Sequence, residues 1–209
     1  MTARDDVAGA GRKRWPEGYD PVRTRRQILD SALYLFEKNG FDRTSLQEIV
    51  DRAHLTKGAL YHHFESKEDL LWQIQDEYLD VQIQKVREIV GQDTSPDEQI
   101  RELITFSMLS VAKYRGQVAI FHQERRHLTG ERLTAITEKR DEVETLFRGA
   151  VQRGADMGVF KKDLSARIVT FGIIGMCAWA FQWFRPTGDL SFENVADQFS
   201  QLVIDGLSD

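Results

Sequence analysis

Four side chains near position 60 have types and a spacing that suit contact with a polyanion. Lys57, Gly58, Tyr61 and His62 stand at i, i+1, i+4 and i+5, so a helix would place them on one side. They offer a cation, a position open to close approach, a phenol and an imidazole, which suit phosphates and base edges in the major groove of DNA. Taken singly, each could belong to a solvated face, and Tyr61 could be a core aromatic. Their spacing within the surrounding elements favours DNA binding.

The flanking sequence predicts two short helices joined by a tight turn. Thr56 can cap a helix that runs to Phe64, in which Leu60 and Phe64 face inward, opposite the polar side. The preceding helix starts at Thr44 or Ser45 with the capping-box pattern. Only two residues separate the two helices, which predicts a helix-turn-helix.

Further helices surround this pair. One begins at Asp20, an N-cap acceptor followed by proline, and ends at Gly40. Another opens at Ser66 and runs to about Val90, so it is contiguous with both parts of the chain and is the expected lever between them. The remaining helices are predicted near residues 96–114, 117–127, 131–154, 163–184 and 192–207.

The runs GFDRTSLQEI at 40–49 and LTKGALYHHFESK at 55–67 resemble the TetR family of transcriptional repressors. The resemblance covers roughly residues 22–71. It implies an all-α fold, with an N-terminal helix-turn-helix three-helix head at 20–67 and a C-terminal helical ligand-binding and dimerisation body at 68–209. One departure is His54, at a turn position where the family usually has glycine.

The resemblance also implies roles for particular residues. Those that would hold phosphates are Thr44, Tyr61 and Lys67. Those that would enter the groove are Thr56, Lys57, Gly58 and His62, and His63 would lie beside them. Two heads related by a twofold axis would reach major grooves about 34 Å apart and recognise a palindromic operator. Release by an effector predicts a repressor. A ligand-responsive activator and a helical dimeric scaffold without DNA-regulated switching are the alternatives.

Composition and charge fit a globular helical protein with a local polyanion-binding face. The 209 residues are 41% hydrophobic and 29% charged, with a net charge of −5. Residues 1–67 hold 12 basic and 10 acidic residues, giving +2, and the remainder hold 16 and 23, giving −7. The lone Cys177 cannot form an intramolecular disulfide, and the N-terminus lacks an apolar signal segment, so we expect a cytoplasmic protein.

The sequence predicts no catalytic, cofactor or metal site. His122 and His127 are five residues apart and would not share a helix face, and His62 and His63 point in different directions. A nucleophile elbow, a phosphate-binding loop and a Cys/His pair are all absent from the sequence. We therefore expect a protein that is not an enzyme and needs no cofactor or metal.

The last two predicted helices, 163–184 and 192–207, are the candidates for a homodimer interface. Small residues such as Gly172 and Gly175 would let another helix approach closely, and two such helices from each chain would form a four-helix bundle. Alternatively, these residues pack within one chain. The uncharged run 168–184 has 17 residues, at the lower limit for a transmembrane helix, so we expect a buried helix and no membrane span.

Aromatic and basic residues recur together in the body, which suits a cavity for a small apolar or amphipathic effector. The candidate ligand-binding residues are Phe106, Leu109, Phe121, His122, Arg125, Arg126, Trp179, Trp183 and Arg185. The runs 124–128 and 179–186 resemble the TetR subgroup that controls fatty-acid and sterol-ring catabolism, which implies an acyl-CoA thioester as effector. Alternatively, the tryptophans belong to the core, and Arg125 and Arg126 pair with Glu124 and Glu131.

The N-terminal segment, residues 1–19, is polar and shows no hydrophobic period. It carries the basic triplet at 12–14, so we expect a disordered basic arm. Such an arm is either a solvated tail or a segment that touches DNA.

Overall fold

The computed structural model describes residues 19–208, so all but the last residue of the expected N-terminal arm lies outside the described residues. Within this range the chain forms α-helices and one 3-10 turn, and no strand. The all-α prediction is confirmed. The helices are α1 (Pro21–Asn39), α2 (Leu46–Ala53), α3 (Lys57–His63), α4 (Lys67–Val90), α5 (Pro96–Lys113), α6 (Arg115–Gln123), η1 (Arg125–His127), α7 (Gly130–Asp156), α8 (Ala166–Trp183) and α9 (Phe192–Leu207).

Side-chain caps set the starts of the head helices where the sequence predicts them. The Asp20 carboxylate accepts hydrogen bonds from the backbone N–H groups of Val22 and Arg23 at 3.0 and 3.1 Å. Ser45 and Glu48 form a reciprocal capping box at the start of α2. These side chains satisfy N–H groups that the first helical turn leaves without partners.

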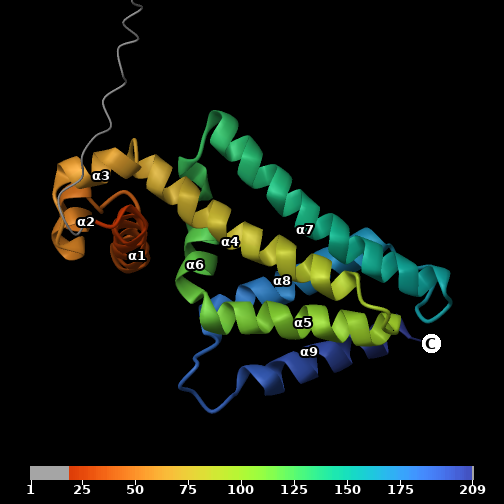
Figure 1. The fold of residues 1–209 in the computed structure, drawn as a ribbon. Helices are drawn as coiled ribbons and strands as arrows, with labels where there is room; N and C mark the ends of the chain where they lie inside the picture. The colour runs from red at the N-terminus through yellow and green to blue at the C-terminus, as the bar shows by residue number, and fades with distance from the viewer. Residues whose placement is uncertain (1–18, 209) are drawn as a thin grey trace, which may run out of the picture.

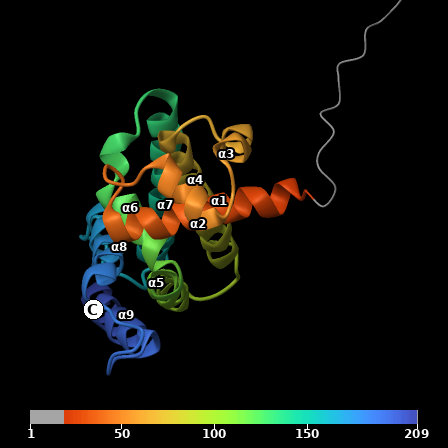
Figure 2. The ribbon, with the colours of Figure 1, turned by 90° about the vertical axis from the view of Figure 1, so that its left-hand side faces the viewer.

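Helices α1, α2 and α3 gather at one end of the molecule, opposite the C-terminus (Figure 1). Phe36, Ile49, Leu60 and Phe64 are buried between them. In the view turned by 90°, α1 crosses in front of α4 and α6 (Figure 2). The head therefore rests on the body, and its buried cluster continues into the body through residues such as Ile120.

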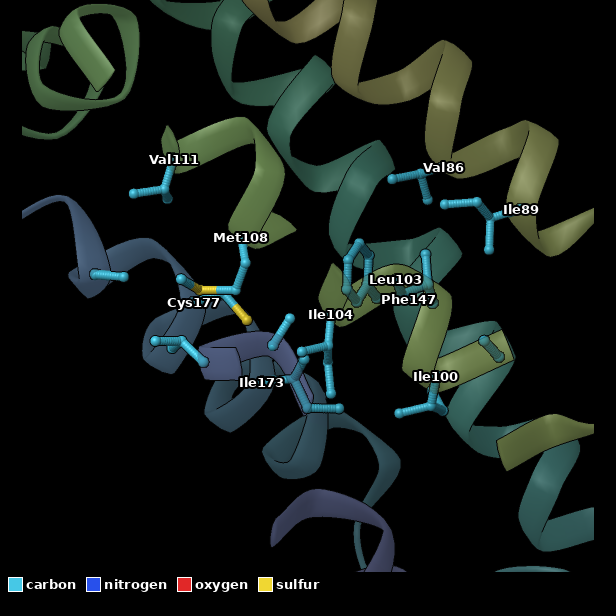
Figure 3. Close-up of a cluster of buried hydrophobic side chains, with 14 of the residues drawn as sticks. Val86, Ile89, Ile100, Leu103, Ile104, Met108, Val111, Phe147, Ile173 and Cys177 are labelled. Carbon is cyan, nitrogen blue, oxygen red and sulfur yellow. The ribbon is translucent and has the colours of Figure 1, made fainter. Parts of the chain in front are cut away.

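Helix α4 runs from the head into the body, where it packs along α7 (Figure 1). Helix α5 packs against α8 and α9. Figure 3 shows the core that results, with Met108 and Ile104 of α5 beside Ile173 and Cys177 of α8. Burial of these side chains joins α4, α5, α7, α8 and α9 into one helical body.

The main difference from the predicted helices lies at residues 117–127, where the sequence predicts a single helix. Helix α6 ends at Gln123, and the chain tightens into the 3-10 turn η1. The amide of His127 bonds to the carbonyl of Glu124 at 3.1 Å, and that of Leu128 bonds to the carbonyl of Arg125 at 3.0 Å. The change of helix type places Glu124 at the junction between head and body.

Candidate nucleic-acid interface and ligand cavity

The outer side of α3 carries the residues that the sequence predicts to meet DNA. Lys57, Gly58, Tyr61 and His62 are all exposed. Within residues 19–208, the Lys57 ammonium has no ion pair or hydrogen bond that would compete with a phosphate. A Cβ built on Gly58 would meet only the Thr56 hydroxyl, at 3.7 Å, so another molecule can approach this backbone closely. The face can therefore offer a cation, a phenol and an imidazole together.

Short-range contacts hold α3 in place. The exposed Thr56 caps the helix, because its hydroxyl oxygen accepts a hydrogen bond from the N–H of Ala59 at 3.2 Å. The turn before it passes through His54 in the left-handed region, with φ 54°, where the family pattern has glycine. Leu60 and Phe64 anchor the inner side of the segment, at 0% and 1% exposure. Helix α3 is thus held by a cap at its start and by two buried side chains, and its other side is exposed.

The ammonium of Lys67 is directed into the protein, which argues against the phosphate-binding role that the resemblance implies. Its ammonium donates hydrogen bonds to the carbonyl oxygens of Phe41 and Thr44, both at 2.9 Å, and lies 3.4 Å from that of Asp42. It also lies 4.4 Å from the centre of the Phe41 ring. Because an ammonium has three donors, these three carbonyls occupy it. Lys67 closes the loop between α1 and α2.

Thr44 is likewise corrected as a phosphate ligand, because its side chain is buried at 1% exposure. Its hydroxyl lies 2.9 Å from the carbonyl oxygen of Gly40 and 3.2 Å from that of Leu35, so it donates back to the end of α1. A hydroxyl turned inward in this way stabilises the loop and offers nothing to a phosphate outside it. Ser45, the next residue, is the one that caps α2.

His63 is partly buried beside the groove-facing residues of α3, with its ring centre 5.2 Å from that of His62. Its Nε2 lies 2.6 Å from the Tyr19 hydroxyl, and the two rings are stacked. Burial, together with the nearby His62 and Arg25, lowers the pKa of His63 below its ordinary value, so the ring is neutral at pH 7. His63 therefore fixes the start of the described chain against α3.

A cavity of about 540 Å³ lies in the body between α4, α5, α6, α7 and α8. Its apolar lining includes Val111, Val118 and Phe147. Two predicted ligand residues, Phe121 and His122, lie on its α6 wall. The His122 ring stacks on Phe181 at 5.5 Å. Although the residue is exposed, the protein around its ring partly desolvates it, which lowers the pKa of His122 and keeps the ring neutral at pH 7.

The other predicted ligand residues do not line this cavity. They are Phe106, Leu109, Arg125, Arg126, Trp179, Trp183 and Arg185. Trp179 and Trp183 are 62% and 41% exposed because they sit on the outer side of α8. Leu109 is exposed on α5, whereas Phe106 packs against the body core.

The three predicted arginines are engaged elsewhere. Arg185 donates to the carbonyl oxygens of Gln182 and Phe184 at the end of α8. Arg125 bonds to Thr137 on α7 at 3.3 Å. Arg126 lies in the turn after α6, 3.7 Å from the Asp42 carboxylate of the head. None of these three positions is at the cavity.

The cations that line the cavity are Arg140 of α7 and Arg167 of α8. Neither is among the ligand-binding residues predicted from the sequence. Arg167 is exposed and lies 5.5 Å from the centre of the Phe171 ring, whereas the Arg140 side chain, 42% exposed, pairs with Asp141 at 2.9 Å. Their partial exposure puts them at the rim. The lining also includes Cys177, and burial raises the pKa of its thiol to about 12, so it is protonated.

Comparison with known proteins identifies the family. Residues 93–207 match the model of the tetracyclin repressor-like C-terminal domain, and residues 28–74 match that of bacterial regulatory proteins of the tetR family. The chain belongs to the TetR family. It is similar to the HTH-type transcriptional repressor KstR2 of Rhodococcus jostii, with 34% identity over 88% of this chain and 91% of the relative. The relatives that resemble this chain are transcriptional regulators.

Two solved structures are also similar to this TetR-family protein. The ketosteroid transcriptional regulator KstR2 of Mycobacterium tuberculosis matches with a TM-score of 0.82 and 27% identity, over 88% of this chain and 95% of that one. AibR, solved in complex with isovaleryl coenzyme A and operator DNA, matches with a TM-score of 0.78 and 29% identity, over 86% and 97%. The likeness therefore includes both the head and the body.

TetR-family repressors bind operator DNA as dimers, and α8 has a surface suited to a second chain. Ile168, Gly172, Gly175 and Trp179 are exposed at helical spacing along it. Both glycines have nothing within 4 Å of a built Cβ, so a partner helix could approach closely. On α9, Leu202 is 66% exposed. This exposed apolar stripe matches the predicted use of these two helices in dimerisation.

By length and composition alone, α8 could also cross a membrane, and 33% of it is buried in this chain. The core helix of a soluble protein meets the same criteria. The buried residues of α8, such as Ile173 and Cys177, pack into the body. A partner chain on the exposed stripe would bury the opposite side, which accounts for the uncharged run that follows Arg167 in α8 without a membrane.

Proposed function

We propose that this TetR-family protein is a homodimeric, sequence-specific repressor that leaves a palindromic operator when an acyl-CoA thioester enters the body cavity. The residues of 20–67 read the DNA, and those of 68–209 bind the effector and the partner chain. The protein acts in the cytoplasm, and it controls transcription without catalysing a reaction. A ligand-responsive activator with the same parts is the alternative, which differs only in the direction of the transcriptional response.

The observation that carries DNA binding is the open face of α3. Lys57 supplies a cation without a competing partner, and Gly58 permits close approach of the DNA backbone. Tyr61 and His62 stand one turn further along the same face. A single such module buries on the order of 600–1,000 Å² on DNA, so two heads are needed for a specific site. Dimerisation through α8 and α9 supplies the second head.

The observation that favours an acyl-CoA is the combination of an apolar interior with two arginines at the rim. A volume of about 540 Å³ suits a drug-sized apolar group. Arg167 can pair with a phosphate outside it, because a guanidinium fork matches phosphate oxygens, and Arg140 can do so by exchanging its partner Asp141 for a phosphate. The carboxylates of Asp141 and Glu144 also line the cavity, so the phosphate contact depends mainly on Arg167. The acyl group would enter between Val118 and Phe147 while the CoA phosphates stayed at the rim. The similarity to AibR, solved with isovaleryl coenzyme A and operator DNA, supports the same class.

The proposal is tested first with DNA alone. Duplexes selected from a random pool by the purified protein are expected to contain a palindrome, and fluorescence anisotropy should give a stoichiometry of at least one dimer per site. A protein that selects no common sequence at low salt contradicts the repressor proposal.

The second test adds isovaleryl-CoA and octanoyl-CoA to the complex, with free coenzyme A and octanoate as controls. Thioesters are expected to release the operator, and Arg167→Gln should raise the required concentration about tenfold, because one charge-assisted contact contributes about 1.5 kcal/mol. Arg153→Gln, an exposed α7 variant away from the cavity lining, is the matched control. Equal responses of the two variants contradict a phosphate site at the rim.

A further inference from the structure

We propose that Glu124 is the positioning residue that couples the effector cavity to the DNA-binding head. Glu124 begins the run 124–128, and none of these residues lines the cavity. In this proposal, its carboxylate latches the loop between α1 and α2 in the position that binds the operator, and displacement of α6 by an effector releases the latch. The inference rests on the proposed function, and it names the contact through which that function is regulated.

The latch is a buried hydrogen bond between body and head. Glu124, at 8% exposure, accepts a hydrogen bond from the backbone N–H of Phe41 through Oε1 at 3.1 Å. A Cβ built on Gly40 would lie 3.6 Å from the same oxygen, and Gly40 has φ 83°, a conformation that favours glycine. The turn at the end of α1 thus presents a loop N–H to a carboxylate of the body.

The second carboxylate oxygen strengthens the same junction. Oε2 of Glu124 lies 3.3 Å from Nε2 of His127, whose ring packs 4.6 Å from the ring of Phe41. The Asp42 carboxylate lies 3.6 Å from the same nitrogen. Phe41 is therefore held by a hydrogen bond at its N–H and by an aromatic contact on its side chain.

From Phe41 the connection continues to α3, the helix proposed to enter the major groove. Lys67 binds the Phe41 carbonyl oxygen at 2.9 Å and stands at the first position of α4. Only the segment 64–66 separates α4 from the end of α3. The loop between α1 and α2 consequently joins Glu124 on one side to α3 on the other.

On the body side, Glu124 follows the cavity wall directly. Phe121 and His122 line the cavity, and the amide of Glu124 still bonds to the carbonyl of Ile120 at 2.9 Å, within the last turn of α6. Helix α6 also packs against α1, α4 and α8. An effector that moves Phe121 and His122 outward must therefore move Glu124, and only a ligand that favours the moved state shifts the equilibrium.

The first experiment needs no effector. Glu124→Ala is expected to lower operator affinity about fivefold or more and to accelerate hydrogen exchange of the Phe41 amide, because the latch is lost. Glu124→Gln keeps an acceptor for that amide and should stay closer to the wild type. Glu138→Ala removes an exposed carboxylate from α7 and is the control. Unchanged affinity and unchanged Phe41 exchange in Glu124→Ala overturn the latch. Circular dichroism verifies that each variant is folded.

The second experiment adds octanoyl-CoA to the dimer. In the wild type, the thioester is expected to accelerate exchange of the Phe41 amide as it releases the operator. In Glu124→Ala the thioester should still bind, but the ratio of operator Kd values with and without it should fall toward one. If octanoyl-CoA releases the operator with no change at Phe41, the latch is wrong and the proposed function stands. If it fails to release the operator from the wild type, the proposed effector is wrong, and the effector-free experiment decides the latch.

Discussion

The ammonium of Lys67 lies 2.9 Å from the carbonyl oxygen of Thr44. Together with the bond to Phe41, this contact places a single cation under the loop that joins α1 to α2. A lysine near DNA-binding residues is expected to contact phosphate, but its charge is here directed into the protein. We therefore expect substitution of Lys67 to affect mainly the stability of the head, and substitution of Lys57 to affect mainly DNA binding.

Replacing Lys67 with methionine should destabilise the head. The variant keeps apolar contact with Phe41 but removes the donor to three carbonyls, so we expect the free energy of unfolding to fall by about 1–2 kcal/mol. Urea denaturation followed by circular dichroism measures it. The salt dependence of operator binding by the folded variant should match that of the wild type. A slope lowered by about one unit per head would show that Lys67 neutralises a phosphate after all.

Lys57→Ala should give the complementary result. The exposed ammonium has no partner to lose within residues 19–208, so the free energy of unfolding should change by less than about 0.5 kcal/mol. Operator affinity should fall, and the slope of log K against log salt should flatten by about one unit per head. Titrations at several salt concentrations measure it. An unchanged slope would remove Lys57 from the interface.

The head could be predicted from sequence to a large extent because its signals are local. Asp20 and Ser45 each cap a helix within three residues, so their spacing is visible in the sequence. The contact between Lys67 and the loop at 41–44 joins residues more than twenty positions apart. That contact depends on how the loop packs in three dimensions, so no local sequence pattern predicts it.

The cavity was less predictable, since helical periodicity shows which residues share a face but not which neighbour that face meets. Trp179 and Trp183 look like part of a ligand site and lie on the outer side of α8. Arg140 stands among charged residues and resembles any surface arginine. Arg167 had one available signal, its place at the start of the uncharged run 168–184.

The exposed stripe of α8 predicts how dimerisation can be broken. Trp179→Arg puts a charge where a partner helix is proposed to pack, and each dimer carries the change twice. We expect the dimer Kd to rise at least about a hundredfold, because a buried tryptophan at the centre of an interface contributes about 2 kcal/mol or more. Light scattering after size-exclusion chromatography measures the mass. Met157→Arg, also exposed but at the end of α7, should remain dimeric. A dimeric Trp179→Arg would place the interface elsewhere.

Two glycines on α7 make a matched pair for stability. A Cβ at Gly154 would lie 2.1 Å from the buried Phe160 ring, whereas a Cβ at Gly149 would meet nothing within 4 Å. Gly154→Ala should therefore lower the free energy of unfolding by about 1–3 kcal/mol through overpacking. Gly149→Ala should raise it by about 0.5–1 kcal/mol, because alanine favours the helix. Denaturation at one fixed protein concentration compares them. Changes of the same sign would contradict the close packing of Phe160 on Gly154.

The pKa of His122 predicts a loss of stability in acid. Partial desolvation lowers the pKa of the ring in the folded protein, so the unfolded chain, with a pKa near 6.5, binds a proton more readily than the native ring does. Because His122 is exposed, solvent screening keeps the effect small. The penalty is absent at higher pH, and it grows as the pH falls through about 6.5 toward the lowered native value. His122→Phe keeps a ring against Phe181 and cannot titrate. Between pH 7.5 and 5.5, the wild type should lose more unfolding free energy than this variant. His63, whose pKa is also lowered, remains in both proteins and cancels in the difference. Parallel pH profiles would mean that the His122 ring takes up a proton as readily in the folded protein as in the unfolded chain.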